Sequence, residues 1–190
     1  MSPGSSPIET LLELQVLDDL PRTGWVQAGI AGGETVGAHT LGVAFLVLLL
    51  APKVEPALDT GRAVALALLH DVGEARLGDL PSTARGYLPD GAKAAAEAAA
   101  ARDLLEPFGA GVGELAAEAS RGADREARFV RLADRLQLGL RLLAYLRAGR
   151  RGLGDFRRGL DRLECSEFPP LASLHTELLA ALDSAAGGPR

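Results

Sequence analysis

Cysteine is nearly absent from the sequence, since Cys165 is the single one. An intrachain disulfide is therefore excluded, and we expect a reducing compartment such as the cytoplasm.

Long hydrophobic runs are also missing. The longest, residues 41–52, is too short to span a bilayer, so we expect a buried core helix there. Residues 1–7 lack the positive charge of a signal peptide, and we expect them to be a disordered segment without targeting function.

An excess of basic charge is missing as well. The 190 residues include 20 basic and 25 acidic side chains, which gives a net charge of −5. This balance leaves no electrostatic footprint for a nucleic-acid polymer, so we expect neither nucleic acid nor a membrane as a partner. A small anionic ligand would need local positive charge or a metal ion. The hydrophobic fraction of 47% is enough for one domain with one core.

Sustained period-two alternation, the pattern of half-buried strands, is not found, whereas helical patterns are frequent. The sequence therefore predicts an all-α fold, a single helical domain over residues 8–186 followed by a frayed tail at 187–190. Proline, glycine and capping residues mark the expected helix ends. Helices are expected over 8–20, 35–50, 60–71, 92–105, 112–121, 125–147, 153–163 and 169–186. We expect a glycine-rich loop over 21–34 and a turn or short helix over 73–86.

A His-Asp pair follows an apolar helix near the middle of the chain, as His70 and Asp71. A carboxylate at the end of a buried helix must be paired, hydrogen-bonded or bound to a metal. The pair offers a neutral nitrogen and an anionic oxygen, so it indicates a metal site, although a buried hydrogen-bonded pair in a helical scaffold is the alternative. Glu74 can face the same pocket if the helix continues. Asp79 follows in a turn, where local turn or cap hydrogen bonding would also explain it.

Histidine is scarce enough for each of the three residues to be considered separately. His39 lies on an apolar helix face, where a core histidine and a metal ligand are both possible. His175, in the last helix, is expected to be a surface or packing residue. The side chain of Asp134 lies beside the apolar face of its helix, and the pattern alone favours an ion pair with Arg131 or Arg141.

Five short blocks, in order, resemble the HD-domain 5′-deoxynucleotidases, which are metal-dependent phosphohydrolases. The blocks are Pro21-Arg22-Thr23-Gly24-Trp25-Val26, Glu34-Thr35-Val36-Gly37-Ala38-His39, Leu69-His70-Asp71-Val72-Gly73-Glu74-Ala75, Gly78-Asp79-Leu80-Pro81 and Phe129-Val130-Arg131-Leu132-Ala133-Asp134. The resemblance covers roughly residues 8–182. It implies an HD-domain helical bundle, usually a homodimer, that removes phosphate from deoxyribonucleoside 5′-monophosphates with a divalent metal.

The resemblance also implies a role for each matching residue. The expected metal ligands are His39, His70, Asp71 and Asp134. The expected catalytic and substrate-handling acids are Glu74 and Asp79, and the residues expected to line the nucleotide pocket are Arg22 and Trp25. Because His175 is remote in sequence from the other two histidines, we expect a single divalent ion. Two imidazole and two carboxylate ligands do not select among Mn, Co, Fe, Ni, Zn and Mg. Trp25 is as often a core anchor as a stacking surface.

These residue types suit phosphate-ester hydrolysis. Glu74 would accept a proton from water or orient the water, and Arg22 would offer a planar donor fork to the phosphate. Asp79 would protonate the leaving oxygen or contact the sugar hydroxyls. One departure is Ala38, where the family often has an acidic residue. Thr35 can still cap the helix, and the missing reciprocal carboxylate of a capping box costs roughly 0.5–1 kcal/mol.

Two other functions remain as alternatives. One is an HD phosphohydrolase that acts on a different nucleotide or phosphoester. Alarmone hydrolases are disfavoured within that group, because they typically carry Glu-Asp where this chain has Glu74 and Ala75. The other is a non-catalytic nucleotide-sensing module with a structural metal, against which the presence of both Glu74 and Asp79 counts.

Overall fold

The computed structural model describes residues 6–186, and within that range it is helical, with one isolated bridge between Pro21 and Thr35 and no strand. The predicted all-α fold is confirmed. The helices are α1 (Pro7–Leu14), α2 (Val16–Asp19), α3 (Thr23–Gln27), α4 (Val36–Leu50), α5 (Thr60–Leu69), α6 (Glu74–Leu77), α7 (Ala92–Leu105), α8 (Ala110–Arg121), α9 (Arg125–Arg147), α10 (Gly154–Asp161) and α11 (Pro169–Ala186). Short 3-10 turns are η1 (Ala51–Lys53), η2 (Ser82–Tyr87) and η3 (Glu106–Phe108).

The expected terminal segments fall mostly outside this range. Residues 1–5 and 187–190 are not among the described residues. At the near edge of the first segment, Ser6 caps α1 by accepting a hydrogen bond from the backbone N–H of Glu9, and Pro7 is the first helical residue. The structure therefore places the last residues of the expected disordered start in a helix.

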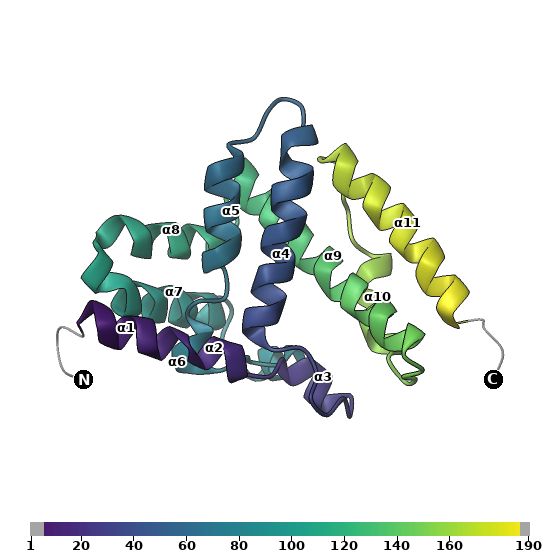
Figure 1. The fold of residues 1–190 in the computed structure, drawn as a ribbon, viewed down its shortest axis with the longest axis horizontal. Helices are drawn as coiled ribbons and strands as arrows, with labels where there is room; N and C mark the ends of the chain where they lie inside the picture. Colours follow the sequence, from purple (N-terminus) through teal and green to yellow (C-terminus); the bar gives the residue numbers. More distant parts are fainter. Residues whose placement is uncertain (1–5, 187–190) are drawn as a thin grey trace.

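The long helix α9 crosses the middle of the molecule, and α4, α5, α10 and α11 pack against it (Figure 1). Their buried side chains, among them Leu66, Phe129 and Leu136, form the main core. Helices α7 and α8 form a hairpin toward the α1 end of the molecule, with a second, smaller core around Leu104. The hydroxyl of Thr10 in α1 donates to the carbonyl oxygen of Leu104 at 3.1 Å, which ties α1 to this hairpin.

Side-chain N-caps begin three helices of the main core. Thr35, Asp59 and Asp124 each accept a hydrogen bond from the backbone N–H three residues later, at 3.2, 2.9 and 2.8 Å. Such caps satisfy amide groups that have no partner within a helix. The predicted starts of α4, α5 and α9 are confirmed, including the capping role of Thr35 without a reciprocal carboxylate.

The helix expected to carry the His-Asp pair ends just before it. Helix α5 ends at Leu69, His70 is its C-cap, and the chain turns before α6 begins at Glu74. The turn is held close to α7, because a Cβ atom on Gly73 would lie 2.5 Å from the carbonyl oxygen of Glu97. Only glycine allows this approach, which brings α6 and α7 together.

Helix α4 is half-buried, so the expectation of a buried core helix holds for one side only. Val36, His39, Val43 and Val47 are buried on one side. The opposite side is apolar but 49–62% exposed, and its residues are Leu41, Phe45, Leu48 and Leu49. By length and composition alone the segment Val36–Lys53 is sufficient to cross a membrane, which differs from the sequence expectation, although core helices of soluble proteins meet the same criterion.

Candidate metal centre

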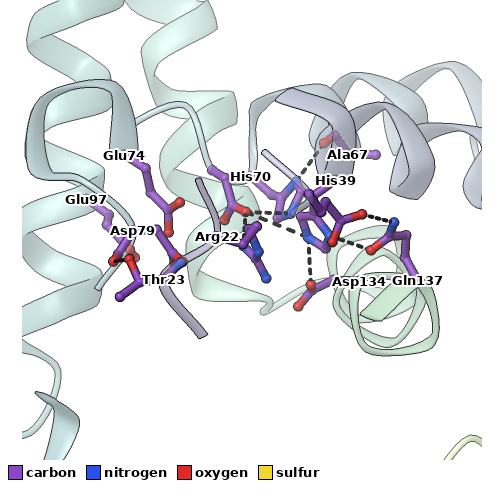
Figure 2. Close-up of polar contacts among 12 residues, drawn as sticks. Arg22, Thr23, His39, Ala67, His70, Glu74, Asp79, Glu97, Asp134 and Gln137 are labelled. Carbon is purple, nitrogen blue, oxygen red and sulfur yellow. Dashed lines mark hydrogen bonds and ion pairs between the residues drawn. The ribbon is translucent and has the colours of Figure 1, made fainter. Parts of the chain in front are cut away.

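His39 of α4 and His70 at the end of α5 turn their rings toward each other (Figure 2). One buried nitrogen of each ring lies near the carboxylate of Asp71. Nε2 of His70 lies 3.2 Å from Oδ2 of Asp71, and Nε2 of His39 lies 3.8 Å from the same oxygen. One ligand atom from each of the three residues lies within 4.8 Å of the other two. Within residues 6–186, neither Nε2 atom has a hydrogen-bond partner. Buried nitrogens without a partner beside a carboxylate fit a divalent cation.

The opposite nitrogen of each ring is held by an oxygen. Nδ1 of His70 lies 2.7 Å from the carbonyl oxygen of Ala67, and Nδ1 of His39 lies 2.5 Å from Oε1 of Gln137. A carbonyl oxygen only accepts, so Nδ1 of His70 carries the hydrogen when the ring is neutral. Its Nε2 atom then offers a lone pair, as a metal-ligating histidine requires.

Asp134 extends this group on the side of α9. Its Oδ1 atom lies 3.0 Å from Nε2 of His39. The ion pair that the helical pattern favoured is wrong, because Arg141 pairs instead with Glu34, at 2.9 Å. Asp134 is not one of the three residues whose ligand atoms all lie within 4.8 Å of one another. It therefore contacts the group through His39, from the helix that crosses α4.

Charge holds the group together. Burial acts to lower the pKa of His70, but the adjacent carboxylate of Asp71 outweighs burial and raises that pKa to about 9. Burial acts to raise the pKa of Asp71, and the neighbouring His70 and Arg22 hold it well below its usual range. The pKa of Asp134 is also lowered, because its contact with His39 outweighs burial. Two anions and a proton thus occupy the place where a cation would bind.

Glu74 is buried beyond Asp71, with 1% of its surface exposed. Its Oε1 atom lies 3.6 Å from Nζ of Lys93, and its Oε2 atom has no hydrogen-bond partner among the described residues. Burial, together with the charges of Asp71 and Asp79, raises its pKa to about 8. A carboxyl group with that pKa can take up and release a proton near neutral pH. Helix α5 does not continue to Glu74, which was the condition for Glu74 to face this pocket. A separate helix, α6, begins at Glu74 and places it there instead.

Arg22 and Thr23 make side-chain and backbone contacts at the start of α3, which lies within the expected 21–34 loop. Nη1 of Arg22 donates to Oδ2 of Asp71 at 3.1 Å. The backbone N–H of Thr23 donates to Oδ2 of Asp79 at 2.5 Å, and the Thr23 hydroxyl donates to the Asp79 carbonyl oxygen at 2.6 Å. Asp79 therefore has a capping role, one of the alternatives that the sequence left open, but it caps the distant helix α3 rather than its own turn.

Trp25 is a core residue. Only 2% of it is exposed, and its ring stacks on Phe156 at a centroid distance of 4.0 Å and meets the edge of Tyr145 at 5.0 Å. Its indole N–H donates to Oε2 of Glu34 at 3.1 Å. The structure thus places Trp25 as the core anchor that the sequence left as one of two possibilities, with part of the ring reaching the adjacent cavity.

Several of these side chains line one cavity of about 470 Å³. That volume is in the range of pockets that hold small molecules. Its polar wall includes Arg22, Asp71, Glu74, Asp79, Lys93 and Asp134. Its apolar wall includes Leu138 of α9 and Phe156 of α10. His175 lies elsewhere, with Nε2 at 2.9 Å from the carbonyl oxygen of Leu160, in the packing role expected for it.

Lys93 is the cavity residue that sequence reasoning missed, because the alanine-rich helix 92–105 was expected to be a plain surface helix. Its ammonium group forms an ion pair with Glu97 and faces Glu74. Burial acts to lower the pKa of Lys93, and the contact with Glu97 outweighs this and raises it. The sequence does contain a signal: Lys93 is one of two lysines among 20 basic residues.

Known proteins share this arrangement of sequence and fold. An HD-domain family model, HD_3, matches residues 15–157, a range that includes every residue of the metal group. The 5′-deoxynucleotidase VV1113 of Vibrio vulnificus is 31% identical over 147 residues, which cover 72% of this chain and 75% of that protein. The human 5′-deoxynucleotidase HDDC2 is 28% identical over 133 residues, which cover 68% of this chain and 63% of that protein.

A solved structure supports the fold over nearly the whole chain. The crystal structure of the PH0347 protein from Pyrococcus horikoshii has a TM-score of 0.77 and 30% sequence identity. The match covers 92% of this chain and 99% of that one.

Proposed function

The chain belongs to the HD-domain 5′-deoxynucleotidase family, and we propose that it hydrolyses deoxyribonucleoside 5′-monophosphates to deoxynucleoside and phosphate. The family match and the relatives support an HD phosphohydrolase. The choice of substrate class draws on the names of those relatives. The observation that carries the proposal is the position of two buried histidine Nε2 atoms beside the carboxylates of Asp71 and Asp134. Asp71 lines the cavity that also contains Glu74 and Arg22.

The donor set fits one divalent metal ion. We propose that the ligands are His39, His70, Asp71 and Asp134. Mn, Co, Fe, Ni, Zn and Mg are all compatible with two imidazoles and two carboxylates. When bound, such an ion supplies Lewis acidity for a phosphate ester and lowers the pKa of water.

Two basic side chains are placed to bind the phosphate. The guanidinium of Arg22 uses Nη1 to contact Asp71, which fixes its orientation beside the metal ligands. A planar guanidinium has several donors, so those of Arg22 that do not face Asp71 suit phosphate oxygens. Lys93 lines the same cavity and adds a second cation next to Glu74. Both side chains would therefore compensate the negative charge of a phosphate monoester.

Glu74 is the proton acceptor in this proposal. Its Oε2 atom is buried and has no partner in the described part of the chain, so it is available to a water molecule that attacks phosphorus. Its raised pKa of about 8 makes it a stronger base than an ordinary carboxylate. Asp79 lines the same cavity while one of its oxygens is held by Thr23. We assign it to the leaving 5′ oxygen or the sugar hydroxyl.

The nucleoside would lie along the apolar wall. Leu138 and Phe156 line the cavity, and Trp25 supports Phe156 by stacking on it. Trp25 in this arrangement acts on the base or sugar through Phe156, since little of its own surface is exposed. Apolar and aromatic walls with a few polar groups are typical of small-molecule sites.

Phosphate release from a panel of nucleotides tests the proposal. The panel contains deoxyribonucleoside and ribonucleoside 5′-monophosphates, each with Mn²⁺, Co²⁺, Mg²⁺ or a chelator. We expect metal-dependent release that favours the deoxynucleotides and is lost in Glu74→Gln. Glu114→Gln, an exposed glutamate paired with Arg102 on the α7–α8 hairpin, is the matched control and should retain activity.

The opposite outcome is also informative. Absence of release with every metal, in folded protein that calorimetry shows to bind the ion, would overturn the nucleotidase assignment. A different phosphoester or a nucleotide-sensing role would then account for the same site.

We also propose that the protein is a homodimer in a reducing cytoplasm. The exposed apolar side of α4 would face a second copy, because contiguous exposed apolar surface on a helix is typical of an interface. The buried thiol of Cys165 is the single cysteine and suits a reducing compartment.

A further inference from the structure

We propose that Glu34 and Gln137 are positioning residues that select which ring nitrogen His39 presents to the metal. The inference rests on the metal site of the proposed function but not on its substrate. Glu34 was placed in a loop by the sequence, and Gln137 had no assigned role. Both are buried, with 5% and 6% of their surfaces exposed, and His39 is fully buried.

The three side chains form a chain of short hydrogen bonds. Oε1 of Gln137 lies 2.5 Å from Nδ1 of His39 (Figure 2). At the other end of the same amide, Nε2 of Gln137 donates to Oε1 of Glu34 at 2.7 Å. The amide of Gln137 therefore bridges a carboxylate and an imidazole.

The direction of these bonds is determined by Glu34. An ionised carboxylate can only accept, so the amide group of Gln137 must turn its NH₂ toward Glu34. Its carbonyl oxygen then faces His39, which must donate from Nδ1. A reversed amide would place two acceptor oxygens, from Gln137 and Glu34, against each other. When Nε2 binds a cation, His39 is thus the Nδ1–H tautomer, and its Nε2 lone pair faces the same space as Asp71 and Asp134.

Glu34 is itself fixed by further donors. Its Oε2 atom accepts from the indole N–H of Trp25 at 3.1 Å, and Oε1 also accepts from Nε of Arg141 at 2.9 Å. Its backbone N–H donates to the hydroxyl of Tyr145 at 2.8 Å. The carboxylate therefore cannot rotate without losing several hydrogen bonds. The backbone carbonyl of Glu34 also accepts from the N–H of Arg22 at 3.0 Å, which links the phosphate-binding arginine to the same residue.

Helix packing restricts Gln137 as well. Helix α4 passes so close to α9 that a Cβ atom on Gly42 would lie 2.8 Å from Nε2 of Gln137. The amide therefore has little room to adopt another rotamer. Steric confinement and hydrogen-bond direction act together on the tautomer of His39.

The consequence is measurable as metal affinity. An Nε2–H tautomer of His39 would direct a hydrogen, rather than a lone pair, toward the ion. Loss of a residue that orients a metal-ligating histidine typically lowers metal affinity by about 10-fold to 100-fold. Gln137→Met keeps a side chain of similar length but removes both the acceptor and the donor. We expect it to lower Mn²⁺ or Zn²⁺ affinity, measured by calorimetry, within that range.

A second readout reports the tautomer directly. ¹⁵N shifts of the His39 ring, recorded with diamagnetic Zn²⁺ bound, distinguish a hydrogen on Nδ1 from a hydrogen on Nε2. We expect Nδ1–H in the unsubstituted protein and a mixed population in Gln137→Met. Neither measurement depends on phosphatase activity, so failure of this inference is distinguishable from failure of the nucleotidase proposal.

A further variant separates positioning from stability. Phe129→Leu, in the core on the same helix, should lower stability and leave affinity unchanged. Unchanged affinity and tautomer in folded Gln137→Met, or equal affinity losses in Phe129→Leu and Gln137→Met, would overturn the inference.

Discussion

Oε1 of Glu74 and Nζ of Lys93 face each other at 3.6 Å inside the cavity, one from α6 and one from α7. The ammonium group is shared, because it also forms an ion pair with Glu97. Lys93 lowers the pKa of Glu74, but burial and the neighbouring aspartates outweigh this effect. The proposed base is therefore tuned by a residue from a helix that has no other evident part in the chemistry.

Replacement of Lys93 by methionine should weaken catalysis in two ways. It removes a cation that would contact phosphate, and it raises the pKa of Glu74 further, because a nearby positive charge is lost. A charge-assisted contact contributes about 1.5–3 kcal/mol, which corresponds to a loss of about 10-fold to 100-fold in kcat/KM. The measurement is the pH profile of kcat/KM, with its acidic limb displaced to higher pH. Lys53→Met, at the other lysine and exposed, is the control, and equal losses in both variants would contradict the role.

The metal-free protein should lose stability as the pH rises. The pKa of Glu74 is raised from 4.5 to about 8, and that of His70 from 6.5 to about 9. Between these limits the folded state holds protons that the unfolded chain releases, so the free energy of unfolding falls with increasing pH. Thermal denaturation between about pH 5 and pH 9 measures this. Glu74→Gln should remove the lower part of the slope, and a pH-independent melting temperature would exclude the effect.

Metal binding should show the opposite pH dependence. A cation at His70 competes with the proton that this ring holds in the metal-free protein, so metal affinity rises with pH up to the raised pKa of about 9. Calorimetry in buffers of different ionisation enthalpy measures the protons released. Binding without proton release near neutral pH would show that the ion does not contact His70.

Gly73 is expected to tolerate no side chain. A methyl group there would lie 2.5 Å from the Glu97 carbonyl oxygen and would push α6 away from α7. We expect Gly73→Ala to cost about 1–3 kcal/mol of stability and to lower activity, since Glu74 follows directly. Gly111→Ala in α8 is the control, because its Cβ would meet no atom within 4 Å in the described part of the chain. Chemical denaturation and activity of both variants provide the test, which a fully active Gly73→Ala would fail.

The exposed side of α4 should hold the proposed dimer together. Phe45 is 55% exposed at its centre, flanked by Leu41 and Leu49 on the same side. Phe45→Glu would bury a charge in such an interface, so we expect monomers by light scattering, with the helical circular dichroism unchanged. Leu12→Glu, at an equally exposed apolar residue of α1, should leave the dimer intact. Protein that is monomeric before any substitution would refute the proposal.

Local chemistry made much of the fold predictable. The helix 92–105 has the predicted bounds because alanine-rich sequence favours helix regardless of its neighbours. Asp124 fixed the start of α9 by a hydrogen bond to its own first turn. Elements that depend on distant partners were not predictable in this way. Helix α3 is capped by Asp79, 56 residues later.

The candidate site likewise has features that the sequence predicted and features that depend on distant partners. The proximity of His39, His70 and Asp71 was expected from the resemblance, and the structure brings their ligand atoms together. The partner of Asp134 was not evident from its own helix, because His39 reaches it from α4. Lys93 was missed because its partner Glu74 lies on a separate helix.

The two hydrophobic cores divide the site between them. His39 and Asp134 project from α4 and α9, helices of the main core, whereas Lys93 belongs to the hairpin built around Leu104. Helix α6, which begins with Glu74, packs on that hairpin. Val72, which follows Asp71, is also buried in the smaller core. Opening of that core would therefore displace Glu74 and Lys93 and disturb the turn that carries His70 and Asp71, while His39 and Asp134 stay on helices of the main core. Damage to the α7–α8 hairpin would thus inactivate the protein before α4 and α9 unfold.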